Sequence, residues 1–390
     1  MAWKNFLLAG MAALWIGSLP LLCYAREVPK GNWQPELRVG ISGTQKTVTF
    51  QANMDGKLAS PVSPKENVSV RRGESVTVML SGREFQVKGK KLSGEFLDLR
   101  PLDPRELGEM ITRVHGTSYR GGIRLRRQGD AMKVINLLPA ESYLRGVLPE
   151  EMPASWEEEA LKVQAVAART FALKNRKRHE EEGFDLCDTT HCQLYTGTKE
   201  ETPRTDSAIK ATYGEVLVTK KGEALISAVF HTDSGGMTEN SEDVWGTHSP
   251  YLRAVKELKS ETHPWSKTVS LDSFQSKFNV GRIKDIVLSP LTVGKGGKDR
   301  TSSGRVKTVR VLGRNGSKMV SGADMRSLFG LKSTLFSVKL TGKQVVFSGF
   351  GWGHGLGMSQ WGAKAFAGRG DDYRKILFHY YQNTAIKKLY

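Results

Sequence analysis

The chain of 390 residues is 39% hydrophobic and 25% charged, which excludes a wholly disordered or collagen-like protein. Lysine and arginine number 58 against 40 aspartates and glutamates, a formal excess of 18 positive charges. This excess predicts a polyanionic partner, and charge alone leaves nucleic acid, an anionic membrane and an acidic cell-wall polymer as alternatives.

The N-terminus has the pattern of an export segment. Lys4 precedes an apolar stretch over residues 6–22, and the small residue Ala25 follows shortly after it. Residues 1–25 are therefore expected to be a signal peptide or an uncleaved membrane anchor, and both alternatives stay open. An exported protein meets little nucleic acid. We therefore expect no nucleic-acid partner, a place in the cell wall or at the outer face of the cytoplasmic membrane, and membrane contact only through this segment.

The next part of the chain is rich in predicted strands. Between Glu36 and Asp103 short runs alternate apolar and polar residues and are separated by glycine-containing turns. Residues 26–115 are expected to form an all-β accessory region, and a second strand-rich stretch runs from Tyr119 to Leu138. With the helices predicted further on, the fold class is α+β.

A long helix is predicted next, since Ser155 and Glu158 have the spacing of a capping box and the helical period continues to about Arg178. Glu150 and Glu151 lie before it, after a predicted strand that ends near Leu148.

A carboxyl group in this connection is a candidate general acid. Pro153 restricts the backbone beside Glu151, and the neighbours Leu148, Met152 and Trp156 are apolar. Desolvation there would raise the pKa of a carboxyl group toward neutrality, as a general acid requires. The alternative is an ordinary surface glutamate.

The second half of the chain contains a basic segment. We predict a short helix over residues 205–212, a hairpin over 216–231 and a closing strand over 385–389. The segment from Lys277 to Lys318 contains eleven lysines and arginines but only two aspartates and no glutamate. Residues 257–345 are therefore expected to be a basic subdomain. Such a segment is either a binding patch or a solvated face.

A glycine-rich segment precedes the last predicted helices. Alternating glycines occupy residues 349–357, with Trp352, His354, Gln360 and Trp361 among or close behind them. Such glycines allow a ligand to approach the main chain closely or form a structural turn. The aromatic side chains favour the floor of a sugar-binding cleft.

Several separated motifs support a family resemblance. Leu137–Pro153 (LLPAESYLRGVLPEEMP) and its continuation Ala160–Thr170 resemble the stage II sporulation protein D family, which includes amidase-enhancer proteins. Three further motifs follow in the family's order: DTTHCQ at Asp188–Gln193, FHTDSGGMTE at Phe230–Glu239 and GWGHGLGMSQWGA at Gly351–Ala363. The similarity extends over residues 116–390.

The resemblance implies a function. It implies a lytic transglycosylase that cleaves denuded peptidoglycan strands to 1,6-anhydro products in sporulation or cell-wall remodelling, with Glu151 as the catalytic residue and a central helix lining a glycan cleft. The substrate-binding residues that it implies are Arg169, His231, Ser234, Gly235, Gly236, Trp352, His354 and Gln360. The enhancer branch implies the alternative, a non-catalytic wall-binding activator of an N-acetylmuramoyl-L-alanine amidase. Expected partners are thus glycan strands and a cell-wall amidase.

Cys187, His191 and Cys192 form a small cluster. In an exported protein the two cysteines are compatible with a disulfide, whereas two thiolates and an imidazole are also zinc ligands. His179 is the one nearby candidate for a fourth ligand. The resemblance implies zinc in this loop, where we expect it to be structural, and no other cofactor is expected.

Overall fold

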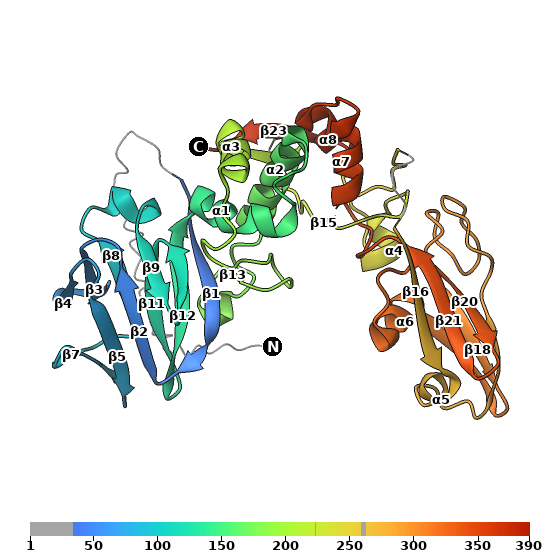
Figure 1. The fold of residues 1–390 in the computed structure, drawn as a ribbon, viewed down its shortest axis with the longest axis horizontal. Helices are drawn as coiled ribbons and strands as arrows, with labels where there is room; N and C mark the ends of the chain where they lie inside the picture. The colour runs from blue at the N-terminus through green and yellow to red at the C-terminus, as the bar shows by residue number, and fades with distance from the viewer. Residues whose placement is uncertain (1–33, 223, 259–262) are drawn as a thin grey trace, which may run out of the picture. The chain divides into compact units, whose positions relative to one another are not determined.

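The computed structural model describes residues 34–222, 224–258 and 263–390. It has the expected α+β fold (Figure 1). None of the helices in these ranges is long and apolar enough to cross a membrane. The predicted signal peptide or anchor, residues 1–25, lies outside the described residues.

Two antiparallel-rich sheets dominate the first third of the described chain (Figure 1). The seven-stranded sheet has the order β13 (Leu186–Cys187), β1 (Glu36–Gln45), β12 (Ala131–Pro139), β11 (Gly122–Gln128), β8 (Phe96–Pro101), β3 (Gly56–Ser60), β4 (Ser63–Val70). The six-stranded sheet has the order β10 (Thr117–Arg120), β9 (Ile111–Val114), β2 (Thr47–Ala52), β5 (Ser75–Ser81), β6 (Glu84–Val87), β7 (Lys90–Leu92). Strand β2 alternates exposed with buried residues, as a strand with one face on a core does.

The structure does not separate residues 26–115 from the part of the chain after residue 115. Strand β1 pairs with β12 along most of its length, and β9 pairs with β10 across the turn at residues 115–116. Both sheets therefore contain strands from either side of the expected boundary. The physical reason is that cross-strand hydrogen bonds join residues far apart in the chain, which local patterns do not report.

A helix occupies the place where a strand was expected near Leu148. Helix α1 spans Ala140–Glu151, and its buried residues Tyr143, Leu144, Val147 and Leu148 recur at helical spacing. Pro149 lies inside its last turn and does not end the helix. Glu151 is therefore the last residue of a helix.

The predicted capping box is also wrong. Helix α2 spans Glu158–Lys174 with Glu157 at its N-cap and no side-chain cap hydrogen bond. Ser155 instead lies in a turn, in which the Trp156 amide donates to the carbonyl of Pro153 at 3.0 Å. Pro153 explains the gap between the helices, since it disfavours helical backbone in the residue before it.

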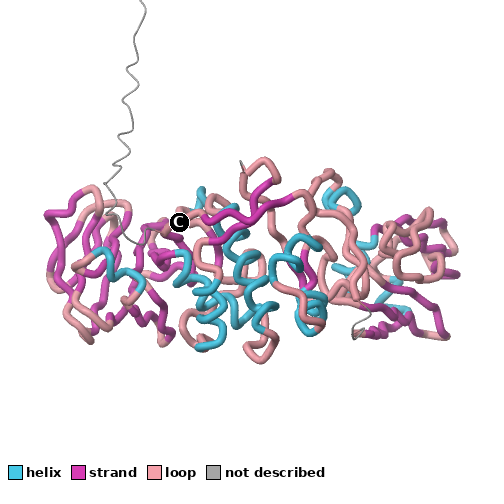
Figure 2. Tube along the Cα trace, turned by 90° about the horizontal axis from the view of Figure 1, so that it is seen from above, coloured by secondary structure: helices cyan, strands magenta, loops and turns pink. Residues whose placement is uncertain are grey.

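Helix α2 is the centre of a helical cluster. Figure 2 shows helices gathered in the middle of the described chain, between parts that are rich in strands. Helix α2 packs against α1, α3 (Pro203–Ala211), α7 (Gln360–Gly368) and α8 (Tyr373–Tyr380). The predicted helix at 205–212 is thus confirmed as α3. The predicted closing strand is confirmed as β23 (Thr384–Lys388), which pairs with β14 (Glu215–Thr219). Among the described residues of the predicted 216–231 hairpin, Val218 and Leu225 form an antiparallel bridge.

Residues 264–350 have a core of their own, centred on aromatic side chains such as Phe274, Phe329 and Phe347. One sheet contains β16 (Pro264–Ser270), β21 (Gln344–Phe350) and β20 (Phe336–Thr341). Another contains β17 (Ile283–Val287), β18 (Thr308–Gly313) and β19 (Gly316–Ser321), and the helices are α5 (Leu271–Gln275) and α6 (Gly322–Phe329). This segment contains most of the expected basic subdomain.

Two short elements connect these parts to the glycine-rich segment. Strand β15 (Phe230–His231) pairs in parallel with β22 (Met358–Ser359), and α4 (Ser241–Trp245) follows β15 in the chain. Two motifs that lie more than a hundred residues apart in the sequence are therefore hydrogen-bonded neighbours.

Candidate active site

Glu151 and Gln360 meet although 209 residues separate them. Glu151 ends α1 and Gln360 begins α7, and the Gln360 side-chain amide donates to Glu151 Oε2 at 3.3 Å. Ser359 fixes the start of α7, because its hydroxyl accepts a hydrogen bond from the Gly362 amide at 3.2 Å. The helix cap thereby places Gln360 against the carboxyl group.

The surroundings of Glu151 change its protonation. Burial raises the pKa of Glu151 to about 7, against hydrogen bonds from Gln360 and the Leu194 amide that favour the charged form. The neighbouring Glu150 is held separately, since the Thr196 hydroxyl donates to it. Near neutral pH the Glu151 carboxyl is therefore able both to give and to take a proton.

Aromatic side chains lie close to this pair. The rings of Trp156 and Trp361 are 4.9 Å apart, and the His263 ring is 4.3 Å from Trp361. The Lys364 ammonium lies 4.6 Å from the centre of the Trp361 ring. Aromatic walls with a few polar groups are typical of ligand sites. Trp361 follows Gln360 directly in α7, so the aromatic group lies on the helix that carries the partner of the candidate acid.

The predicted residues Ser234, Gly235 and Gly236 build a turn against the start of α7. The Ser234 amide donates to the Ser359 hydroxyl at 3.2 Å, and its own hydroxyl donates to Glu257 Oε2 at 2.5 Å. The amides of Gly235 and Gly236 donate to Asp233 Oδ1 and to the Ser234 hydroxyl. These residues support the segment that carries Gln360.

One glycine of the glycine-rich segment is required by this packing. Gly351 has a φ of +75°, and a Cβ there would lie 2.8 Å from the Asp233 carbonyl. A larger residue would separate the two motifs, because both the backbone angle and the space exclude a side chain.

His231 and His354 lie side by side, with ring centres 5.3 Å apart. Burial and nearby Arg305 lower the pKa of both, that of His354 to about 4. Both imidazoles are therefore neutral at pH 7 and do not serve as general acids there. Trp352 is more open to solvent, with 53% of its surface exposed and the Lys332 ammonium 4.7 Å from its ring.

Arg169 is not the cleft residue that the resemblance implies. Its side chain is fully buried and forms a two-pronged ion pair with Glu141, with both distances at 2.7 Å. It also donates to the carbonyls of Ile209 and Glu215. Every nitrogen of its guanidinium donates to a group of the protein, so Arg169 stabilises the fold.

The structure brings four candidate metal ligands together: His179, Cys187, His191 and Cys192, whose donor atoms all lie within 4.8 Å of one another. Both cysteines are free. Burial raises the pKa of Cys187, but hydrogen bonds with Thr189 and His191 lower it to about 6. The Glu182 carboxylate lies 2.6 Å from His179 Nδ1, which leaves Nε2 to face Cys192.

Several residues close to the site were not predicted from the sequence. Asp233 Oδ2 lies 3.0 Å from His263 Nδ1, and Glu257 binds the hydroxyls of Ser234 and Tyr380. Asp233 belongs to a motif quoted above, and this signal could have found it. His263 and Glu257 belong to none, and only the folded chain brings them here.

Comparisons with known proteins show the family. The family described as SpoIID, Stage II sporulation protein, matches residues 128–218. Stage II sporulation protein D of Bacillus subtilis (strain 168) is 33% identical over 276 residues, covering 66% of this chain and 77% of that protein. Its counterpart in Bacillus amyloliquefaciens is 32% identical, covering 64% and 75%. The Amidase enhancer of Bacillus subtilis is 34% identical over 62% of this chain and 40% of its own length. With most of two stage II sporulation D proteins matched, this chain belongs to the SpoIID family.

Proposed function

We propose that this protein is a lytic transglycosylase that cleaves peptidoglycan glycan strands without stem peptides and leaves 1,6-anhydro ends. The observation that carries the proposal is the Glu151 carboxyl, whose pKa burial raises to about 7 where α1 meets α7. A group with that pKa has the proton affinity that acid and base catalysis at neutral pH needs.

The chemistry requires a single carboxyl group. Protonated Glu151 gives its proton to the glycosidic oxygen as the bond from that oxygen to C1 breaks. The C6 hydroxyl of the same sugar then bonds to C1, and its proton passes to Glu151, which is thereby regenerated. Between the two transfers the carboxylate is stabilised by hydrogen bonds from Gln360 and the Leu194 amide.

The charge of the protein supports the substrate class. Removal of a stem peptide uncovers a lactyl carboxylate on every second sugar, so a bare strand is a regular polyanion. A chain with a formal charge of +18 attracts such a strand. Residues 1–25, as a signal peptide or anchor, would take the protein to the wall or to the outer face of the cytoplasmic membrane.

The cysteine and histidine cluster fits zinc. Tetrahedral zinc holds sulfur at about 2.3 Å and nitrogen at about 2.0–2.1 Å, which separates such ligands by about 3.6 Å. His179 Nε2 lies 3.5 Å from Cys192 Sγ, and His191 Nδ1 lies 3.6 Å from Cys187 Sγ. Bound there, zinc would neutralise the thiolates and tie His179, in the segment after α2, to Cys187 in β13. The proposed reaction uses a sugar hydroxyl as nucleophile and takes no step at this cluster.

A second function has a specific observation in its favour. One relative bears the name Amidase enhancer, and it is as similar to this chain as the sporulation proteins are. On this alternative the protein binds wall polymer and activates an N-acetylmuramoyl-L-alanine amidase without cleaving glycan itself.

Incubation with bare glycan strands, followed by mass analysis of the products, tests both functions. We expect 1,6-anhydro ends from the protein and none from Glu151→Gln, which keeps its shape but cannot give a proton. Glu150→Gln is the matched control and should retain activity. Undiminished turnover by Glu151→Gln would contradict the assignment. Strand binding without products, together with stimulation of an added amidase, would favour the enhancer.

A further inference from the structure

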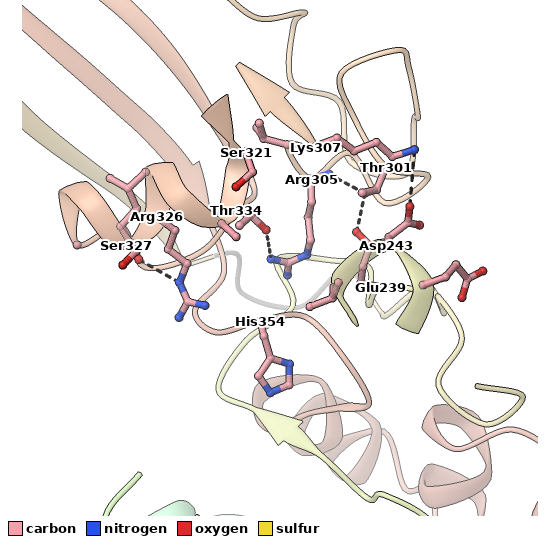
Figure 3. Close-up of a pocket in the computed structure, with 16 residues that line it drawn as sticks. Glu239, Asp243, Thr301, Arg305, Lys307, Ser321, Arg326, Ser327, Thr334 and His354 are labelled. Carbon is pink, nitrogen blue, oxygen red and sulfur yellow. Dashed lines mark hydrogen bonds and ion pairs between the residues drawn. The ribbon is translucent and has the colours of Figure 1, made fainter. Parts of the chain in front are cut away.

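A cavity of about 880 Å³ lies beside the glycine-rich segment (Figure 3). Its walls come from α4 and the residues before it, from the loop at 301–307, from α6 and from His354. Three cations line it: Arg305, Arg326 and Lys307.

Two of these cations have no acidic partner. Arg305 is only 1% exposed, yet no carboxylate in the described part of the chain lies within 4.0 Å of its guanidinium or of Arg326. Arg305 donates to the Ser234 carbonyl at 2.8 Å, and its Nε is buried without a hydrogen-bond partner. Arg326 donates through Nε to the Leu331 carbonyl at 3.3 Å.

The acidic residues of the cavity wall are already engaged. Glu242 forms an ion pair with Arg253 at 2.6 Å, and Asp243 lies 3.6 Å from Lys307. Glu239 accepts hydrogen bonds from the hydroxyls of Thr301 and Ser303. Glu239, Asp233 and Glu257 act on Arg305 only through space, and neither arginine forms a direct ion pair with a residue that the structure describes. A carboxylate ligand in the cavity would supply the direct partner that both arginines lack.

The glycine-rich segment makes room for this cation. A Cβ on Gly355 would lie 2.6 Å from the Arg305 guanidinium carbon, and the φ of +87° also disfavours a side chain there. Five residues later the same segment provides Gln360, the partner of Glu151. The unpaired guanidinium and the candidate acid therefore flank one short stretch of chain.

We infer that this cavity binds a sugar carboxylate through Arg305 and Arg326, and that it recognises the lactyl group of bare glycan strands. Planar guanidinium groups bind carboxylates through paired hydrogen bonds. Neutral sugars have no carboxylate to accept such a pair. The identity of the sugar rests on the proposed function. Carboxylates of stem peptides share this chemistry and are distinguished by the second test.

The first test needs no catalysis. N-acetylmuramic acid carries the carboxylate and N-acetylglucosamine does not. We expect only the former to raise the Tm of the full protein, and we expect Arg326→Gln to abolish the shift. Arg310→Gln removes an exposed cation of the same subdomain and should keep it. Equal shifts from both sugars, or none from either, would overturn the inference whether or not glycan is cleaved.

The second test compares oligosaccharides of equal length by Kd. Bare glycan should bind at least about tenfold tighter than chitin oligosaccharide, and Arg326→Gln should remove that preference. Arg305→Lys keeps the positive charge but cannot donate two parallel hydrogen bonds, so it should weaken the preference for bare glycan. Tighter Arg326-dependent binding of peptide-bearing strands would overturn the sugar assignment. An intact preference without 1,6-anhydro products would instead overturn the proposed function alone.

Discussion

Two of the buried arginines lie in opposite electrostatic settings. Arg169, in α2, is enclosed by a two-pronged ion pair with Glu141 and by backbone carbonyls. Arg305, in the basic subdomain, is equally buried but has one backbone carbonyl, a distant hydroxyl and an unpartnered Nε.

The contrast separates structure from function. A guanidinium whose partners are all supplied by the chain stabilises the fold and is closed to ligands. A guanidinium that faces a cavity and has no direct ion pair retains the capacity to bind an anion. Variants at these two arginines and at other charged or metal-binding groups can be compared by their stability. The comparison tests whether the two settings differ.

The largest effect is expected at the cysteine and histidine cluster, where bound zinc would stabilise the thiolates. The protein should contain about one zinc per chain, and its removal by a chelator should lower stability by more than about 5 kcal/mol. His179→Ala and His191→Ala should lower the zinc content, whereas the exposed control His248→Ala should not.

Thiol titration of denatured protein provides the opposing outcome. An absence of free thiols would indicate a disulfide, and two free thiols without metal would contradict both alternatives. Zinc-free protein that remains folded should keep its activity, because the proposed nucleophile is a sugar hydroxyl.

Removing the partner of the paired arginine should have the next largest effect. Glu141→Gln leaves Arg169 buried without a counter-charge, and we expect a loss of about 3–5 kcal/mol in the free energy of unfolding, measured with urea. Glu181→Gln, an exposed control, should change it by less than about 0.5 kcal/mol. A small loss for Glu141→Gln would mean that this ion pair is not the structural element proposed.

Glu151 should give stability a pH dependence. Its folded pKa of about 7 lies above the ordinary 4.5, so the folded state holds the proton more tightly. The stabilisation is present below pH 4.5 and is lost as pH rises to about 7. At pH 8 Glu151→Gln should therefore be more stable than the wild type by about 2–3 kcal/mol. Parallel curves of unfolding free energy against pH would contradict the raised pKa.

The smallest effect is expected where the buried arginine is unpaired. Arg305→Met should change the free energy of unfolding by about 1 kcal/mol or less, because losing a buried charge without a direct ion pair offsets the lost hydrogen bonds. Arg169→Met is the matched substitution and should cost about 3–5 kcal/mol. Equal losses would show that Arg305 is structural too, and the contrast would fail.

Local patterns are informative where neighbours along the chain decide the outcome. The helix at 203–211 and the strand at 384–388 follow from periodicity, and the family follows from motifs that can be read along the chain. Glu151 is identifiable because Pro153 and nearby apolar residues restrict and desolvate it. Local patterns fail for α1, where they predict a strand. Pro149 lies in the last turn of that helix, and a proline at such a place resembles the end of an element.

Fold class, family and the residue types available for chemistry can all be derived from the amino-acid sequence. The pairing of distant residues cannot, and it is a property of the folded chain: Glu151 lies with Gln360, Arg169 with Glu141, and Arg305 without a direct ion pair to any described residue. This division arises because helix and strand formation depends on side chains a few residues apart. Desolvation and charge pairing depend on groups brought together over many tens to hundreds of residues, and these settle which groups can react or bind.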